Sequence, residues 1–204
     1  MNAPIGARGT GAIEIRDIEV RGQRLRTAVK PGPAGVPPLL MFNGIGANLE
    51  LAFPLLHELK RRGAVIFDVP GVGGSPRPGR PYRAGTLARW ARGVLDALDI
   101  EQADVSGVSW GGGMAQQFAF QHPRRCRRLI LAATSAGMVS LPGKLSVISK
   151  LASNRRYAEP GYMRSIAAEI YGGDFRRDGA LIDRHAAGMR PQSGRGYQLQ
   201  LLAM

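Results

Sequence analysis

A five-residue pattern near the middle of the chain constrains its fold more than any other feature. Residues 107–111 are Gly-Val-Ser-Trp-Gly, and they lie where an apolar stretch, ADVSGVS, leads into a helical one, MAQQFAFQH. This strand–turn–helix setting lifts a serine hydroxyl above the end of a parallel sheet, and glycines are needed because larger side chains would collide there. We therefore predict that Ser109 is a nucleophile and that the turn requires Gly107 and Gly111. The alternative is a glycine-rich turn with an incidental serine.

The segments on both sides of this turn alternate between strand and helix patterns. Alternating polarity at residues 12–20 and 24–30 predicts an antiparallel hairpin. The pattern then continues in the order strand 38–43, helix 48–61, strand 64–69, loop 72–81, helix 85–98, strand 103–109, helix 114–122 and strand 129–134. Such alternation predicts an α/β fold with a mostly parallel sheet and helices on both faces.

The pattern changes after residue 136. Residues 137–204 contain helical stretches interrupted by prolines and glycines, and no further buried strand. We interpret residues 1–136 as the sheet-bearing core and residues 137–204 as an incomplete helical lid. The stretch LILAAT is apolar on both faces, as in an interior strand, but no later strand follows to pair with its outer edge. We therefore expect the last strands to be missing and the sequence to be a fragment.

The composition restricts the function classes. The chain has 204 residues and a formal net charge of +13, which raises the possibility of nucleic-acid binding. The arginines are spread in short pairs, without a basic tail or a nucleic-acid motif, so we expect no nucleic-acid partner. The charge would favour adsorption to an anionic surface. Neither a signal peptide nor a transmembrane run is visible, which predicts a cytoplasmic protein.

Acyl transfer at Ser109 would also require donors for an oxyanion. The amide of the residue after the nucleophile, Trp110, supplies one donor in this kind of turn. The segment Asn43-Gly44-Ile45-Gly46 follows a predicted strand directly, and we assign the second donor to the Ile45 amide, with Gly44 and Gly46 permitting the loop. Taken alone, this segment is better explained as a plain turn between strand and helix, and the presence of Ser109 shifts the interpretation to a functional loop.

A second glycine-rich loop follows Asp68, in the sequence DVPGVGGS. Such a loop can hold phosphate, but here it lacks the Lys-Ser/Thr pair of a P-loop and an immediate helix. We therefore discount a phosphate site, and we expect neither a metal nor a cofactor.

Several sequence blocks together resemble a known family. NGIGANLE, FDVPGVGGS, GVSWGG with MAQQFA, LILAATSAG and IYGGDFRRD occur in the order and spacing of the intracellular poly(3-hydroxyalkanoate) depolymerases of the α/β-hydrolase superfamily, over about residues 36–200. The resemblance implies a granule-associated serine hydrolase that cleaves the ester bonds of a storage polyester. It also implies that Ser109 is the nucleophile and that the Ile45 and Trp110 amides form the oxyanion hole.

The lid would then contact the aliphatic substrate. Candidates for this contact are Tyr157, Tyr162, Met163, Tyr171 and Phe175. The alternative for each of them is ordinary packing within the lid.

The sequence does not supply the remaining members of a catalytic triad. In this fold an acid and then a histidine follow the serine in chain order. The histidines are His57, His122 and His185, and none follows a strand downstream of the lid. Asp183 and His185 are two residues apart on a helix and would face different directions. We therefore expect the acid and the histidine to lie beyond Met204.

Two alternatives remain open. Another member of the superfamily, such as a carboxylesterase, a C–C bond hydrolase or a prolyl iminopeptidase, would keep Ser109 and change the lid. A dehalogenase is disfavoured because it would need an aspartate at position 109. The second alternative is a non-catalytic granule-binding protein or pseudoenzyme, which would bind polyester without hydrolysing it.

Overall fold

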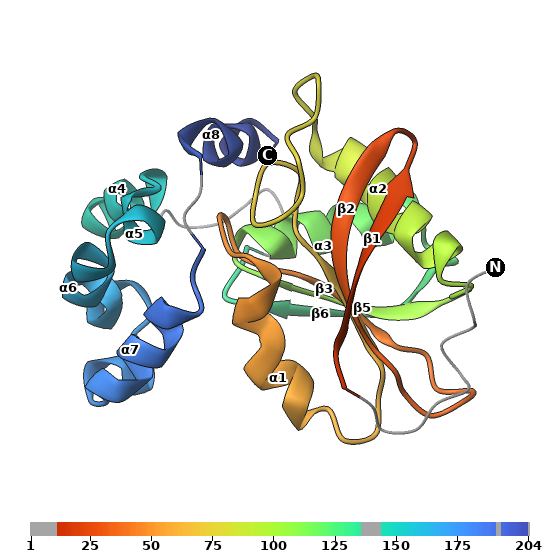
Figure 1. Ribbon diagram of the computed structural model, residues 1–204, viewed down its shortest axis with the longest axis horizontal. Coiled ribbons are helices and arrows are strands. Elements are labelled where there is room, and N and C mark those ends of the chain that lie inside the picture. The colour runs from red at the N-terminus through yellow and green to blue at the C-terminus, as the bar shows by residue number, and fades with distance from the viewer. Residues whose placement is uncertain (1–11, 136–143, 191–192, 204) are drawn as a thin grey trace.

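The structure consists of a sheet-bearing core and a separate group of short helices. The computed structural model describes residues 12–135, 144–190 and 193–203. Figure 1 shows a twisted sheet with helices packed against it, and a crescent of short helices to one side. The predicted boundary at residues 136–137 falls outside the described residues.

The core contains a sheet of six strands in the order β1-β2-β4-β3-β5-β6. The first two strands form the predicted antiparallel hairpin, and β2 also pairs with β4 in an antiparallel manner. The remaining pairings, β4 with β3, β3 with β5 and β5 with β6, are parallel. The strands are β1 (Glu14–Val20), β2 (Gln23–Lys30), β3 (Leu39–Phe42), β4 (Ala64–Phe67), β5 (Ala103–Val108) and β6 (Cys126–Ala132). The prediction of an α/β fold with a mostly parallel sheet is confirmed.

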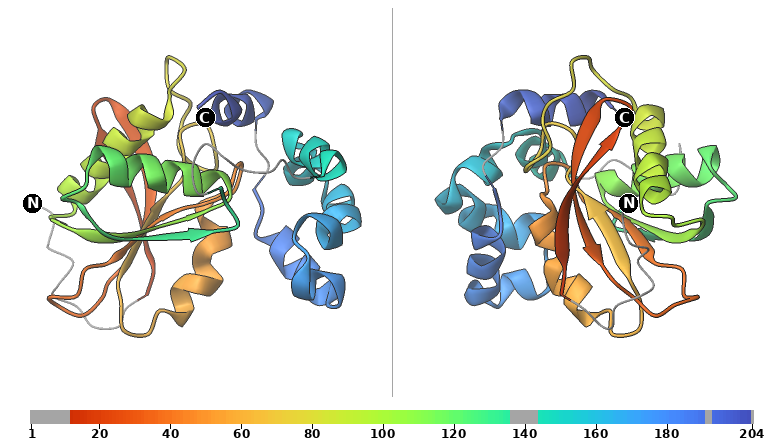
Figure 2. Two further views of the ribbon diagram at one scale, coloured as in Figure 1. Left: turned by 180° about the vertical axis from the view of Figure 1, so that it is seen from behind. Right: turned by 45° about the vertical axis from the view of Figure 1, so that its right-hand side comes forward.

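Helices cover both faces of the sheet, as Figure 2 shows. One face carries α2 (Ala84–Ala97) and α3 (Trp110–Gln121), and the other carries the 3-10 helix η2 (Leu49–Ala52) and α1 (Phe53–Glu58). Neighbouring side chains of one strand pack on opposite faces of the sheet. Leu40 packs in the cluster with α2 and α3, whereas Met41 packs in the cluster with η2 and α1. This is the alternation expected of a strand buried on both sides.

One predicted helix differs from the structure. A single helix was expected over residues 48–61, but the chain forms η2 and then the six-residue α1. Pro54 is the second residue of α1 and has no amide hydrogen, so it suits a first helical turn and would remove a hydrogen bond from a longer helix. The helix therefore begins again at Phe53.

The helical layer, defined as α4 to α8, contains no strand in its described part. Its elements are α4 (Leu145–Ala152), α5 (Arg155–Ala158), α6 (Pro160–Ile170), the 3-10 helix η3 (Gly173–Arg176), α7 (Gly179–Ala187) and α8 (Gly194–Leu202). The layer has a small apolar core of its own, built from Met163, Ala167 and Ile182. In the described ranges, no helix combines the length and the apolar character needed to cross a membrane.

Candidate active site

Ser109 lies in a sharp turn between β5 and α3. Its side chain is exposed, and its backbone angles are φ 54° and ψ −122°, in a region that residues with a β-carbon rarely occupy. The turn ends a buried parallel strand and starts a helix within one residue. This is the setting in which a serine hydroxyl projects from the carboxyl end of a sheet.

The two glycines of the pattern are required by close backbone contacts. A β-carbon on Gly107 would lie 2.2 Å from the carbonyl oxygen of Gly111. A β-carbon on Gly111 would lie 2.2 Å from the carbonyl oxygen of Phe42, at the end of the neighbouring strand β3. Both distances are far below contact distance, so any larger residue would force the backbone apart. The prediction that larger side chains would collide at these two positions therefore agrees with the structure.

The loop Asn43–Gly46 connects β3 to η2 and lies beside Ser109. A β-carbon on Gly44 would lie 3.8 Å from the Cβ atom of Ser109. The carbonyl oxygen of Gly44 accepts a hydrogen bond from the Ala47 amide at 3.1 Å, and this fixes the direction of the Ile45 N–H in the same peptide plane. Trp110 is the first residue of α3, so its N–H has no partner within that helix. The loop and the helix start thus bring two amides to the neighbourhood of Ser109.

The helical layer holds this loop from the other side. The Ile45 carbonyl accepts hydrogen bonds from the Tyr157 hydroxyl at 2.7 Å and from the Arg156 guanidinium at 2.9 Å. The Gly46 amide donates to Oε1 of Gln200 at 2.6 Å. Sequence reasoning missed Arg156 and Gln200, because no pattern near either residue indicates contact with a loop more than 100 positions away.

The five lid residues proposed to contact substrate have different environments. Met163 is fully buried in the core of the helical layer, so the expectation that it contacts substrate is corrected to internal packing. Tyr157 is also buried and contacts the Ile45 carbonyl. The Tyr162 ring lies 4.3 Å from the Arg155 guanidinium.

The other two lid residues, Tyr171 and Phe175, form an aromatic cluster with His185. The ring centroids of Tyr171 and Phe175 are 4.9 Å apart, and each lies within 5.3 Å of the His185 ring. Tyr171 is 40% exposed, so this cluster retains accessible surface.

None of the three histidines is hydrogen-bonded to Ser109 in the part of the chain that the structure describes. His185 shares a hydrogen bond of 3.2 Å with the Tyr171 hydroxyl, and burial, followed by the charge of Arg156, lowers its pKa. His57 lies exposed in the last turn of α1. His122 lies just after the last residue of α3, about 20 Å along that helix from Ser109. Asp183 pairs with Arg164 rather than with His185.

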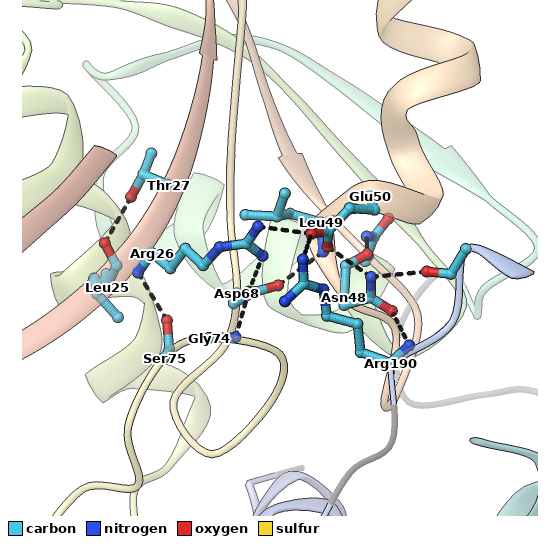
Figure 3. A network of polar contacts seen from close by, with 12 residues as sticks. Leu25, Arg26, Thr27, Asn48, Leu49, Glu50, Asp68, Gly74, Ser75 and Arg190 are labelled. Atoms are coloured by element: carbon cyan, nitrogen blue, oxygen red, sulfur yellow. Dashed lines mark hydrogen bonds and ion pairs between the residues drawn. The ribbon is translucent and has the colours of Figure 1, made fainter. Parts of the chain in front are cut away.

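Asp68 connects the second glycine-rich loop to the core through hydrogen bonds, as Figure 3 shows. Its buried carboxylate accepts hydrogen bonds from the Leu49 amide at 2.7 Å, the Gly74 amide at 2.8 Å and Arg26 at 3.0 Å. Burial raises the pKa of Asp68, although these three donors act in the opposite direction. A β-carbon on Gly73 would lie 2.2 Å from Oδ2 of Asp68, which explains a glycine there. The loop is thus folded around a carboxylate of its own chain.

A polar network extends from Asp68 to the helical layer. Arg26 also bonds Glu50 at 2.6 Å, and Glu50 pairs with Arg190 at the same distance. The Asn48 side chain donates to the Gly188 carbonyl at 3.0 Å and accepts from the Arg190 amide at 3.1 Å. Figure 3 shows these contacts joining the start of η2 to the connection after α7. Apart from the block NGIGANLE, the sequence contained no signal for this contact between η2 and the segment after α7.

Comparison with known proteins agrees with this geometry. Residues 37–190 match the family described as the α/β hydrolase fold. The chain is 52% identical over 190 residues to a poly(3-hydroxyalkanoate) depolymerase of Ectopseudomonas oleovorans, covering 93% of this chain and 67% of that protein. It is 37% identical over 198 residues to a 2-hydroxymuconate semialdehyde hydrolase of Pseudomonas sp. (strain CF600), covering 94% of this chain and 65% of that protein. The chain thus spans about two thirds of the length of these relatives.

Solved structures show the same fold at lower sequence identity. The enol-lactonase from Burkholderia xenovorans LB400 superposes with a TM-score of 0.71 at 22% identity, covering 92% of this chain and 72% of that one. A hydrolase from Pseudomonas aeruginosa PA01 gives a TM-score of 0.69 at 24% identity, covering 96% and 73%. The fold, the turn at Ser109 and the sequence matches together establish that this chain belongs to the α/β-hydrolase fold family, in which it is similar to a poly(3-hydroxyalkanoate) depolymerase.

Proposed function

We propose that this protein hydrolyses ester bonds of poly(3-hydroxyalkanoate) through an acyl-enzyme on Ser109. The observation that carries the proposal is the position of Ser109, in a strained turn at the end of β5 and next to the loop Asn43–Gly46. The substrate class follows from the similarity to the depolymerase of Ectopseudomonas oleovorans.

In the first step, the Ser109 Oγ attacks the ester carbonyl carbon and its proton passes to a general base. The Ile45 and Trp110 amides would donate hydrogen bonds to the carbonyl oxygen as it becomes negatively charged. The tetrahedral intermediate then collapses, the alcohol end of the polymer leaves with the proton, and the acyl group stays on Ser109. Water cleaves this second ester, releases a carboxylic acid and restores the serine.

The aromatic cluster of the helical layer supports an apolar substrate. Tyr171 and Phe175 meet His185 edge to face and surround it with apolar ring surface, and Tyr171 keeps an exposed face. We assign these two rings, with Tyr162, to contact with the aliphatic part of the polymer.

A hydrolysis assay tests the function. The chain is incubated with emulsified polyhydroxyalkanoate and with short p-nitrophenyl esters, and the released hydroxy acid or nitrophenol is measured. We expect Ser109→Ala to abolish release from both substrates. Unchanged hydrolysis in this variant would refute the assignment of Ser109, and binding of polymer without release would favour the non-catalytic alternative. A C–C bond substrate of the semialdehyde hydrolase type serves as the counter-screen.

We further propose that the protein associates with the polyester granule through an arginine-lined groove. A groove of about 530 Å³ lies between the loop at residues 77–81 and α8. Its lining includes Arg77, Arg80 and Arg195 together with Leu199 and Leu202. Within the described residues these three arginines form no ion pair, and the chain carries a net charge of +13. Cationic and apolar side chains side by side suit an anionic, amphiphilic surface.

Sedimentation with polyester particles tests this association. The particles are prepared with and without an anionic phospholipid coat, and the fraction of bound protein is measured at two salt concentrations. Glutamate at positions 77, 80 and 195 should reduce binding to coated particles by at least fivefold. Glutamate at Arg61, Arg124 and Arg177 changes the net charge equally and is the control. Equal losses in both variants would show that only the net charge matters, and the groove would be ruled out.

A further inference from the structure

Helix α8 approaches the core more closely than side chains would allow. Gly196, Tyr197 and Gln200 form its buried face. A β-carbon on Gly196 would lie 1.9 Å from the carbonyl oxygen of Gly71, so the helix contacts the glycine-rich loop backbone to backbone. At the other end of α8 the Ala203 carbonyl accepts a hydrogen bond from the Ala84 amide at 2.9 Å. The position of α8 on the core is therefore set closely at both ends.

Gln200 reaches both halves of the proposed oxyanion hole from this face. Its side-chain Oε1 accepts the Gly46 amide at 2.6 Å, and its backbone carbonyl accepts the indole Nε1–H of Trp110 at 2.9 Å. One residue of the helical layer thus contacts the loop after β3 and the first residue of α3. Gln200 has no exposed surface, so water cannot replace either contact without movement of the helix.

The bond from Gly46 completes a clamp on a single peptide group. The Ile45 carbonyl and the Gly46 N–H belong to the same planar peptide. Its oxygen is held by Tyr157 and Arg156, and its hydrogen is held by Gln200. Because the Ile45 N–H lies on the preceding peptide, this clamp fixes the backbone on one side of the proposed donor. The Gly44 carbonyl, which accepts from the Ala47 amide, lies in the same peptide as the Ile45 N–H and fixes the direction of that donor.

The hydrogen bonding of the Gln200 side-chain amide indicates that Gln200 does more than fill space. Its Nε2 is buried and has no partner among the described groups. A buried donor without a partner lowers stability, whereas an apolar side chain of similar shape would avoid that loss. The arrangement uses the acceptor oxygen of Gln200 and leaves its donor unused.

We propose that Gln200, supported by Tyr157, is a positioning residue that holds the Ile45–Gly46 peptide in the geometry of the oxyanion hole. The docking of α8 on the core then sets the reactivity of Ser109. This inference rests on the proposed function, since it assigns a role within the same site.

The test compares Gln200→Met with Gln198→Met in the full chain. Gln198 lies exposed on the same helix and provides the matched control. Amide exchange of Gly46 is measured by NMR, and the indole resonance of Trp110, assigned with the help of Trp90→Phe, reports whether α8 remains docked. For Gln200→Met we expect Gly46 to exchange about tenfold faster, as for the loss of one buried hydrogen bond, with the Trp110 indole unchanged. Gln198→Met should change neither.

Kinetics separate positioning from packing. Gln200→Met should lower kcat for a p-nitrophenyl ester about tenfold and leave KM within a factor of two, because the lost contact acts on the transition state. Gln200→Glu retains an acceptor oxygen and should recover most of the rate. Tyr157→Phe should act in the same direction as Gln200→Met, whereas Tyr82→Phe, which removes a hydroxyl that donates to the Pro70 carbonyl, should leave kcat unchanged.

Each outcome decides a separate question. Unchanged Gly46 exchange in Gln200→Met would overturn the proposal, and so would an unchanged kcat in a chain whose hydrolysis depends on Ser109. If Gln200→Met also shifts the Trp110 indole, Tyr157→Phe becomes the deciding variant, because it removes one hydroxyl and leaves α8 intact. If the unmodified chain shows no Ser109-dependent hydrolysis, the proposed function fails, and Gly46 exchange alone decides whether Gln200 holds the loop.

Discussion

Ser109 has a left-handed backbone conformation that its own side chain disfavours. Its φ of 54° with ψ of −122° is stabilised by the surrounding structure, including a hydrogen bond from its amide to the Ala132 carbonyl at 2.9 Å. Residues in such regions store about 1–3 kcal/mol of strain, which is usually retained where function depends on it. The strain lifts the hydroxyl away from the sheet.

We predict that Ser109→Gly is more stable than Ser109→Ala by about 1 kcal/mol. Glycine removes the strain at positive φ, and only part of this gain is offset by the greater freedom of glycine in the unfolded chain. Urea unfolding of the two variants measures the difference, and both should be inactive. Equal free energies of unfolding would mean that this backbone stores no strain.

Two glycines of α3 give a second comparison at the residue scale. Gly111 faces the backbone of Phe42 and Asn43 at distances of 2.2 and 2.4 Å from an added β-carbon, whereas Gly113 has nothing within 4 Å. Gly111→Ala should therefore lower the free energy of unfolding by about 1–3 kcal/mol through overpacking. Gly113→Ala should raise it by about 0.5–1 kcal/mol through helix propensity. The same urea experiment checks both variants, and a loss of stability in each would contradict the steric argument.

The sequence predicted these residues because their signals are local. A glycine beside a serine, between strand and helix patterns, carries its structural reason within five positions. Gln200 and Gly46 are separated by 154 positions, and Asn48 and Gly188 by 140. Whether such residues meet depends on how the helical layer packs on the core. A single sequence does not encode that packing in any short pattern. The contacts of the helical layer with the loop beside Ser109 were therefore found only in the structure.

At the scale of elements, the junction between η2 and the helical layer depends on ionised Glu50. Burial opposes ionisation of Glu50, but hydrogen bonds from Arg26 and Asn48 outweigh it and lower its pKa to about 2, from an ordinary value of 4.5. The folded state thus binds a proton less readily than the unfolded state. The stabilisation is complete above pH 4.5 and is lost as the pH falls toward 2.

We predict that Glu50→Gln lowers the free energy of unfolding at pH 7 by about 1–2 kcal/mol, since it leaves Arg26 and Arg190 less well paired. The difference from the unmodified chain should shrink between pH 4.5 and pH 2. Chemical denaturation across this range measures it. Glu58→Gln is the control, because the Glu58 side chain is 75% exposed and its contact with Lys60 is 3.9 Å long. A difference that does not change with pH would contradict the role of the Glu50 charge.

The elements themselves were predicted with different success. The hairpin, the buried parallel strands and α2 follow from periodicity, because each has one consistent pattern of burial. The division of residues 48–61 into η2 and α1 was missed, because the apolar spacing continues across Pro54 while the hydrogen bonding does not. The stretch LILAAT has the composition of an interior strand but was expected to have an unpaired outer edge, and its residues 129–132 lie in β6 at one edge of the sheet.

In the whole molecule, one segment of the core binds three parts of the helical layer. Residues 43–50 comprise the connection after β3 and the first two residues of η2, and they bind α5 and α8 through Ile45 and Gly46. The same segment binds the connection after α7 through Asn48 and Glu50. It carries both the proposed oxyanion donor and the attachment of the helical layer.

The two edges of the sheet differ in their protection against self-association. In β1, Ile15 stands alone between charged residues, whereas β6 presents Leu129, Ile130 and Leu131 with exposed fractions of 40%, 48% and 37%. A continuous apolar edge strand is a template for pairing with another chain. We therefore expect this 204-residue chain to associate through β6 as its concentration rises.

Ile130→Lys tests this expectation against Ile15→Lys. The two isoleucines are equally exposed, at 48%, and lie on opposite edge strands, so the substitutions match in chemistry and differ only in location. A lysine at position 130 interrupts the apolar run of β6 and should shift association to at least fivefold higher concentration in sedimentation velocity experiments. A lysine at position 15 joins an edge that is already charged and should leave association unchanged. If both variants associate like the unmodified chain, the contact does not use the edges of the sheet. The exposed apolar side chains of β6 would then not mediate association of this chain.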